Sequence, residues 1–207
     1  LGEIKDVYKY LVLNNINEIY ASLSELTKEQ IDDIRKFSNQ NNIQLKLLPN
    51  SDELYRSFNK IKHRGPDRSS FLTVNDFVDS YIGFHRLSIM DPSVRGDQPF
   101  KYDIGNRSIY CVCNGEIYNY TEIKDKYDLQ TVSGSDCEVI PQLYMKYGFN
   151  KAIKELSGEF AYLIIDINHE TNVLSVKACV DPTSVRPLFY AENSEAVGFS
   201  SELKGLV

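Results

Sequence analysis

The sequence predicts an α+β fold in which two mainly antiparallel sheets pack face to face and helices cover their outer sides. From about residue 81 onwards, short apolar segments typical of strands follow one another, with helical patterns between them. One of these segments, residues 161–165, does not alternate apolar with polar residues, as a strand with one solvated face would. Such a strand is covered on both faces. A four-layer αββα arrangement supplies that cover, although other α+β folds fit as well.

Strands and helices alternate in the second part of the chain. The segments with strand character are residues 81–89, 109–113, 160–167, 173–180, 187–191 and 197–200. Ser135 is typical of a helix N-cap, because acidic residues suited to the helix dipole follow it, and Gly148 fits the end of that helix. A shorter helix is predicted over residues 150–156.

The first 60 residues predict a small β-α-β element followed by a helix. Thr27 begins a T-K-E-Q capping box, and apolar residues then recur at helical spacing up to about residue 37. Residues 16–20 and 43–48 on either side have strand character. A further helix is predicted over residues 52–61, before Gly65 and Pro66 force a turn.

The amino-acid composition of the chain argues against several classes of function. The chain has 207 residues, 42% of them hydrophobic, which suffices for one sizeable core. Its net charge of −6 argues against a nucleic acid partner. The four cysteines lack the paired spacing of zinc sites, so no metal is expected and they are interpreted as reduced thiols of a cytoplasmic protein. No apolar run is long enough to span a membrane.

Four polar segments at turns and strand ends carry the chemistry. They are His-Arg-Gly-Pro-Asp at 63–67, Arg-Leu-Ser-Ile-Met-Asp at 86–91, Asn-Gly-Glu-Ile-Tyr-Asn at 114–119 and Ser-Gly-Ser-Asp-Cys-Glu at 133–138. A free amino acid offers one carboxylate and one ammonium. The Arg86 guanidinium can hold the carboxylate bidentately, and Asp136 can take the ammonium. Hydrolysis of an amide also needs neutral donors for an oxyanion, for which the Asn114 side chain and the Gly115 backbone N–H are suited.

Taken in this order, the segments closely resemble the glutaminase domain of asparagine synthetases, a class II amidotransferase of the N-terminal-nucleophile (Ntn) hydrolase superfamily. The resemblance runs from about residue 57 to residue 207 and implies the Ntn-type four-layer sandwich. It assigns the same roles to Arg86, Asn114, Gly115 and Asp136. It also places Glu116 and the segment Leu87, Ser88, Ile89 and Met90 around bound glutamine. It implies no cofactor in this domain, with ATP and Mg²⁺ belonging to a C-terminal synthetase domain beyond residue 207.

Two departures from the family pattern concern the N-terminal part. The family's nucleophile is an N-terminal cysteine, whereas Leu1-Gly2 resembles positions just inside its first strand. The cysteine is therefore expected upstream of Leu1, and the chain alone is expected to be inactive. Residues 1–207 are interpreted as the amidotransferase domain, with a family-atypical insertion at about residues 6–56. Val180 and Ser184 also stand where the family usually has Arg and Gly.

The expected function is hydrolysis of glutamine through a cysteinyl thioester, with ammonia passed on for the ATP-dependent conversion of aspartate to asparagine. Alternatives stay open: a non-hydrolytic scaffold domain like that of β-lactam synthetase, an amidotransferase of hexosamine or purine synthesis, or a protein-binding module. A Cys–His dyad between His63 or His85 and a core thiol is disfavoured, because the family uses no catalytic histidine. Taken singly, Arg86 could be an ordinary ion-pair residue and Asp136 a helix cap. A homodimer also remains open.

Overall fold

The computed structural model describes residues 4–22, 26–48, 51–75, 80–194 and 196–206. The chain divides into two compact units. One comprises residues Leu1–Arg56 and Glu192–Val197, and the other comprises Ser57–Ala191 and Gly198–Val207. Within the described residues, no helix is both long and apolar enough to cross a bilayer.

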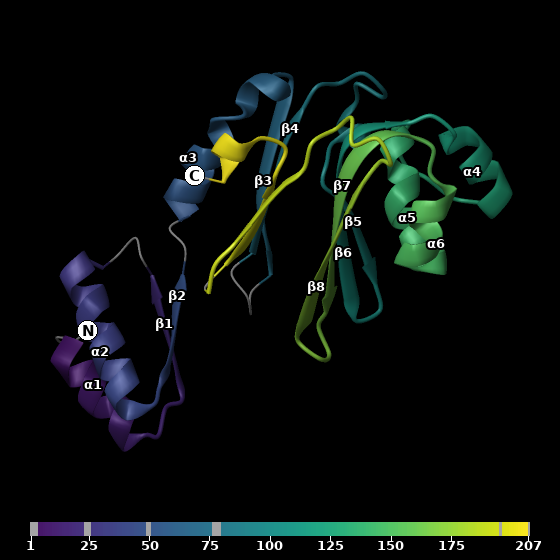
Figure 1. The fold of residues 1–207 in the computed structure, drawn as a ribbon. Helices are drawn as coiled ribbons and strands as arrows, with labels where there is room; N and C mark the ends of the chain where they lie inside the picture. Colours follow the sequence, from purple (N-terminus) through teal and green to yellow (C-terminus); the bar gives the residue numbers. More distant parts are fainter. Residues whose placement is uncertain (1–3, 23–25, 49–50, 76–79, 195, 207) are drawn as a thin grey trace. The chain divides into compact units, whose positions relative to one another are not determined.

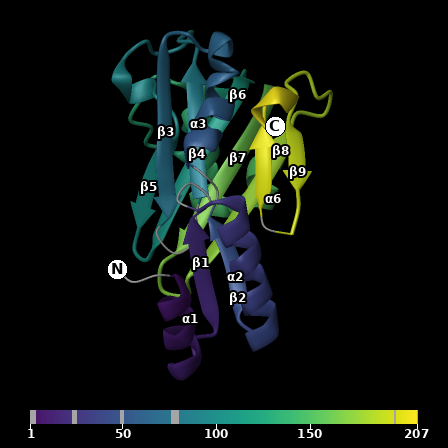
Figure 2. The same ribbon diagram turned by 90° about the vertical axis from the view of Figure 1, so that its left-hand side faces the viewer.

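The first unit contains the predicted β-α-β element (Figure 1). Its elements are α1 (Ile4–Leu13), β1 (Glu18–Ser22), α2 (Lys28–Asn41) and β2 (Gln44–Leu48), and α3 (Ser51–Asn59) begins in it. The two strands pair in parallel, as the crossover through α2 requires. Figure 2 shows them beside α2.

The predicted capping box begins α2. The Gln30 N–H donates to the Thr27 hydroxyl oxygen at 3.3 Å, and the Gln30 side chain accepts the Thr27 N–H at 2.8 Å. The two residues thus satisfy each other's exposed backbone donors, which is why the helix begins here.

Helix α1 packs on α2 within the first unit. Leu1 and Gly2, which resemble positions in the family's first strand, lie outside the described residues, and Ile4–Leu13 form helix α1. The Tyr8 ring of α1 stacks on Phe37 of α2 with centroids 4.1 Å apart. Helix α1 was not predicted from the sequence.

The second unit carries the remaining elements. Its strands are β3 (Arg68–Asn75), β4 (Ser80–Arg86), β5 (Phe100–Ile104), β6 (Arg107–Ile117), β7 (Gly158–Asn168), β8 (Val173–Val180), β9 (Phe189–Glu192) and β10 (Val197–Ser200). Its helices are α4 (Tyr120–Tyr127), α5 (Val139–Tyr147) and α6 (Phe149–Glu155), with 3₁₀ turns at Lys62–Arg64 (η1), Val94–Gly96 (η2), Asp136–Glu138 (η3) and Leu203–Gly205 (η4).

One sheet has the order β5-β6-β7-β8, with every neighbouring pair antiparallel. The strands β3 and β4 form an antiparallel pair, and β9 pairs with β10. The sequence analysis did not predict β3, β5 or α4. It extended β4 to residue 89, whereas β4 ends at Arg86.

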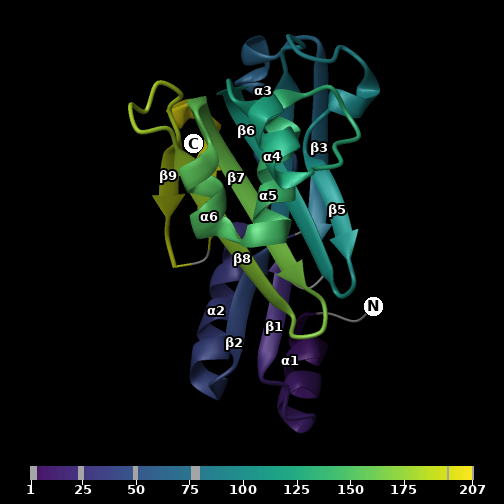
Figure 3. The ribbon, with the colours of Figure 1, turned by 90° about the vertical axis from the view of Figure 1, so that its right-hand side faces the viewer.

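The central strand β7 of the four-stranded sheet is buried on both faces, as the apolar run at residues 161–165 predicted. Figure 3 shows α4, α5 and α6 in front of this sheet, and Ile109, Cys111 and Ile164 pack with these helices in one core cluster. Ile165 and Ile167 point the other way and pack with Val74 and Ile82 of β3 and β4. The sequence therefore lacks polar alternation because each face of the strand contacts a different layer.

Candidate functional site

The Asn-Gly pair lies near the end of β6, with Asn114 opposite Ala161 and Gly115 opposite Phe160 of β7. Strand alternation puts Asn114 on the same face as Tyr110 and Val112, which is the face packed against β3 and β4. Its Nδ2 atom is buried and has no hydrogen-bond partner among the described residues. A buried amide donor without a partner is costly, so such groups are rare and mark candidate ligand sites.

Gly115 meets two steric requirements at once. Its φ is +154°, and a Cβ here would lie 2.0 Å from the Glu159 carbonyl oxygen. Only glycine fits this approach of β6 to β7. The Phe160 carbonyl accepts the Asp181 N–H, and the Phe160 N–H donates to Asp181 Oδ2, so both polar groups point away from Gly115. By antiparallel alternation, the Gly115 N–H is directed to the outer edge of β6 rather than into the β6–β7 ladder.

Asp136 lies at this same edge of β6. It is 6% exposed, and its Oδ2 accepts the Ile117 N–H at 2.6 Å. The neighbouring Cys137 donates its thiol hydrogen to the Gly115 carbonyl at 3.5 Å. The 3₁₀ turn η3 is therefore bonded to β6 on both sides of Glu116, which brings a buried carboxylate beside the Asn-Gly pair.

Glu138 shapes the loop that carries Asp136. The residue is 2% exposed, and its carboxylate accepts the Val132 N–H at 2.8 Å, the Ser133 N–H at 2.6 Å and the Ser133 and Tyr102 hydroxyls. Ser135 is the N-cap residue of η3, as predicted, but its side chain makes no cap hydrogen bond, and Glu138 bonds the preceding loop. The segment begins as η3 and becomes α-helical only at Val139.

Arg86 ends β4 and is buried, on the face of β4 that also carries Ile82. Its Nη1 donates to the Ser93 carbonyl at 2.8 Å and to Asp97 Oδ1 at 2.5 Å. Its Nη2 donates to the Met90 carbonyl at 3.0 Å and to the Asp91 carbonyl. The guanidinium thus folds the loop that follows it, a role that the sequence did not predict.

The rest of the predicted glutamine-contacting segment is largely open to solvent. Leu87, Ile89 and Met90 are exposed by 56%, 66% and 38%. The Ser88 N–H donates to Asp67 Oδ2 at 2.7 Å, which ties this segment to the turn at residues 63–67. Its backbone is therefore held while its apolar side chains face outwards.

Two side-chain contacts join the Arg86 loop to the β6 edge. The Gln98 side chain donates to the Cys113 carbonyl at 3.3 Å and accepts the Cys113 N–H at 2.7 Å. Asp91 Oδ2 accepts the Gly134 N–H at 2.7 Å. The Ser93 hydroxyl and that backbone bond both lower the pKa of Asp91. Arg86, Asn114, Gly115 and Asp136 are thereby brought to one end of the second unit.

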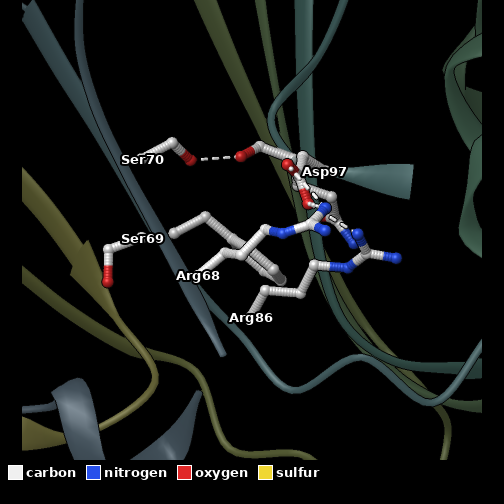
Figure 4. Close-up of a pocket in the computed structure, with 7 residues that line it drawn as sticks. Arg68, Ser69, Ser70, Arg86 and Asp97 are labelled. Atoms are coloured by element: carbon white, nitrogen blue, oxygen red, sulfur yellow. Dashed lines mark hydrogen bonds and ion pairs between the residues drawn. The ribbon is translucent and has the colours of Figure 1, made fainter. Parts of the chain in front are cut away.

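A small pocket opens beside Arg86, between the start of β3, the end of β4 and the loop before β5. In Figure 4 the guanidinium groups of Arg68 and Arg86 both lie against Asp97, and Ser69 points away from them. The sequence motifs do not include Arg68, Asp97 or Gln98, and they include Asp91 without a role. A sequence motif identifies the residues that contact a ligand more readily than it identifies the residues that position those contact residues.

The core thiols do not form a Cys–His dyad. Hydrogen bonding to Cys113, together with burial, raises the pKa of Cys137 well above its usual range, and burial also raises that of Cys111. Protonated thiols are poor nucleophiles. His85 lies elsewhere, with Nδ1 2.7 Å from the Ser69 hydroxyl and Nε2 2.9 Å from the Phe58 carbonyl. Where the structure describes the chain, no cluster of His, Cys, Asp or Glu could hold a metal ion.

His63 and Arg64 belong to the 3₁₀ turn η1, and the Asp67 N–H just after it donates to the Arg86 carbonyl at 3.1 Å. The turn predicted at Gly65 and Pro66 is therefore found beside the Arg86 segment. The His63 and Arg64 side chains also lie against Glu202, with nitrogen to oxygen distances of 3.1 and 3.3 Å.

The turn after β8 places Ser184, which stands where the family usually has glycine, in a left-handed conformation that favours glycine. Ser184 has a φ of +53°. Asp181, 1% exposed, accepts the N–H groups of Phe160, Thr183 and Val185 and the Thr183 hydroxyl. The Thr183 hydroxyl and these backbone bonds lower the pKa of Asp181 to about 2.

The second unit is thus an α+β sandwich whose candidate site holds a buried cation, a buried carboxylate and an unpaired amide donor at the ends of two sheets. Comparison with known proteins gives the family. Residues 41–207 match the family described as "Glutamine amidotransferase domain", and the chain belongs to this family.

Named relatives agree with the resemblance found in the motifs, which is confirmed. The chain is 40% identical over 150 residues to a probable glutamine-hydrolysing asparagine synthetase of Acanthamoeba polyphaga mimivirus, covering 71% of the chain and 26% of the relative. It is 37% identical over 170 residues to a putative asparagine synthetase of Methanocaldococcus jannaschii, covering 75% and 32%. An amidase, chyE, of Penicillium rubens is 35% identical over 158 residues, covering 75% and 22%. The chain thus spans about a third or less of these relatives.

Proposed function

We propose that the intact protein containing this chain hydrolyses glutamine and supplies the ammonia to a C-terminal synthetase domain. That domain would use ATP and Mg²⁺ to convert aspartate to asparagine. Support comes from the family match and from relatives named glutamine-hydrolysing asparagine synthetases, of which the chain covers only the smaller part. The observation that carries the proposal is the buried, unpaired Nδ2 of Asn114 beside the edge-directed N–H of Gly115.

In this proposal, glutamine binds as a zwitterion. Its ammonium pairs with Asp136, whose carboxylate is buried and already oriented by the Ile117 N–H. Its α-carboxylate binds at Arg86, with the backbone of residues 87–90 and Glu116 around the ligand. Buried ionic groups are costly unless they are paired, so each end of the substrate would satisfy a charge that the fold already holds in place.

The chemical step is proposed to use a cysteine thiolate upstream of Leu1, with its own α-amino group as the base. Sulfur attacks the carboxamide carbon, and the negative charge forms on the carboxamide oxygen. Asn114 Nδ2 and the Gly115 N–H would donate to this oxygen as the C–N bond breaks and ammonia leaves with a proton. Water then cleaves the thioester, which releases glutamate and regenerates the thiol. Preorganised donors of this kind are typically worth about 3–4 kcal/mol each in the transition state.

The fold proposed for the domain is the four-layer Ntn-type sandwich, with α4–α6 as one of its outer helical layers. It is supported by the burial of β7 on both faces and by the packing of β3 and β4 against the four-stranded sheet. Residues 6–56 are proposed to be a surface insertion without a catalytic role. In support, β1, α2 and β2 belong to a separate compact unit, and the candidate site residues belong to the other.

The experiment is to measure glutamate and asparagine made by the intact protein from glutamine, aspartate and ATP. Glutamate with stoichiometric asparagine is expected. Glutamate without asparagine would instead indicate an amidotransferase of another pathway or an amidase. Absence of glutamate in a folded protein would contradict the proposal and favour a scaffold domain.

Asp136→Ala provides the matched test of substrate binding in that assay. Turnover should be nearly abolished, because the ammonium loses its only proposed partner. The exposed Asp128→Ala, on the loop after α4, is the control and should keep wild-type turnover. Unchanged activity in Asp136→Ala would remove this residue from the site.

A further inference from the structure

The pocket beside Arg86 contains two guanidinium groups and one carboxylate (Figure 4). Asp97 Oδ1 accepts from Arg86 Nη1 at 2.5 Å, and Arg68 Nη1 lies 3.1 Å from Oδ1 and 3.2 Å from Oδ2. Arg68 is also anchored by a bond to the Pro92 carbonyl at 3.0 Å. The lining residues therefore carry one positive charge in excess, which a second carboxylate would balance.

An incoming carboxylate cannot bind the terminal nitrogens of Arg86 without displacing an acceptor. These nitrogens carry four N–H groups, and four acceptors are bonded to them. Three of the acceptors are backbone carbonyls of one loop, which the fold fixes. The fourth is the Asp97 side chain, which can rotate.

The Asp97 carboxylate can also leave Arg86 without losing all of its bonds. Its side chain is 34% exposed, whereas that of Arg86 is 7% exposed, and Arg68 contacts both of its oxygens. Breaking only the Arg86 bond leaves the Asp97 carboxylate partly solvated and still paired with a guanidinium. The penalty of an unpaired buried charge therefore does not arise.

We propose that the Asp97 carboxylate bonds the Arg86 guanidinium when no substrate is bound. The α-carboxylate of glutamine then replaces Asp97 on Arg86, while Asp97 stays bonded to Arg68. Arg68 and Asp97 are thus specificity-determining residues that set how strongly Arg86 binds a carboxylate. This inference rests on the proposed glutaminase function and deepens it. Gln98, next to Asp97, bonds Cys113 of β6 and so places this exchange beside Asn114.

The test is steady-state glutaminase kinetics of the intact protein. Asp97→Asn removes the competing charge, so the KM for glutamine should fall about 3–10-fold, with kcat within twofold of wild type. Arg68→Gln leaves Asp97 with Arg86 alone, so the KM should rise about tenfold. The double variant should show the lowered KM of Asp97→Asn alone, because the Arg68 effect acts through Asp97.

Two controls separate exchange from a merely structural role. Asp103→Asn removes another surface ion pair, that with Lys101 at 3.0 Å, and should leave the KM unchanged. With glutamine α-amide, whose carboxylate is replaced by a carboxamide, Asp97→Asn should have no effect on the KM. If Asp97→Asn melts early, Asp97→Ser gives the same comparison with a smaller side chain.

A KM for glutamine that is unchanged or raised in folded Asp97→Asn would overturn the exchange, and so would an equal shift for the α-amide. Either result leaves the proposed function intact, since wild-type turnover is still observed. A wild-type protein that forms no glutamate would contradict the proposed function itself.

Discussion

The two halves of the candidate site are built by different means. The half at the β6 edge combines the partly buried Asn114 and Gly115 with the buried Asp136, and it is held by backbone bonds and the Glu138 carboxylate. The other half, residues 87–97, is largely exposed and depends on the side chains of Arg86, Asp91 and Asp97. We infer that the first half is preorganised for the transition state, whereas the second adjusts to the substrate carboxylate.

This difference matters because the proposed function gives the two halves different steps. Oxyanion donors stabilise the transition state only if they are fixed before the reaction begins. A carboxylate site serves binding, where exchange of one acceptor for another costs little. Substitution of Asn114 should therefore change kcat, substitution of Glu138 should change stability, and substitutions in the loop should change KM.

The largest effect is expected for Asn114→Ala. Glutaminase kcat should fall about 10²–10³-fold, as for other oxyanion donors. The free energy of unfolding should stay within about 0.5 kcal/mol of wild type, because Nδ2 has no partner in the described part of the chain. Initial rates and urea unfolding check the two expectations. A decrease below threefold in kcat would exclude the oxyanion role.

The next effect tests the rigidity of the β6 half. Glu138→Ala leaves the N–H groups of Val132 and Ser133 without their acceptor, so unfolding should become easier by about 2–4 kcal/mol. Urea denaturation measures this change. The exposed Glu122→Ala in α4 should stay within about 0.5 kcal/mol of wild type. Similar values for both variants would show that Glu138 does not hold the Asp136 loop.

A smaller effect tests the link between the halves. Asp91→Asn weakens the bond to the Gly134 N–H, so the Arg86 loop should be held less well against the Asp136 loop. The KM for glutamine should rise about 3–10-fold while kcat changes less than threefold. A loss confined to kcat would mean that Asp91 acts on the β6 half instead.

The smallest effect concerns the turn after β8. Ser184 has a φ of +53°, so Ser184→Gly should stabilise the protein by about 0.5–1 kcal/mol with no change in kinetics. Thermal unfolding measures this gain. Ser93→Gly provides a contrast, because Ser93 has a φ of −73° and caps η2, and it should destabilise. A loss of stability in Ser184→Gly would mean that the serine side chain makes a contact that outweighs the strain.

Much of this arrangement could be predicted from the sequence. The capping box at Thr27, the parallel β-α-β element and the double burial of β7 each follow from local patterns, and each is found. The motifs also identified the residues that meet at the site end. The capping hydrogen bonds and the spacing of hydrophobic residues along the sequence predict these features directly.

What could not be predicted depends on long-range contacts. Helix α1 contacts α2 through Tyr8 and Phe37, which are 29 positions apart. Glu138 bonds backwards to a loop, whereas the local pattern indicated only an N-cap at Ser135. Asp97 pairs with Arg68 across 29 positions, and no spacing rule connects them. Contacts of this kind can be identified only from the folded structure, in which the segments that carry these residues lie side by side.

The most direct measurement is a crystal structure of the intact protein with L-glutamine bound. The account predicts the carboxamide oxygen within hydrogen-bond distance of Asn114 Nδ2 and the Gly115 N–H, the ammonium at Asp136 and the α-carboxylate on Arg86. Glutamine bound elsewhere, or bound here with the Asn114 amide directed away from it, would contradict the account.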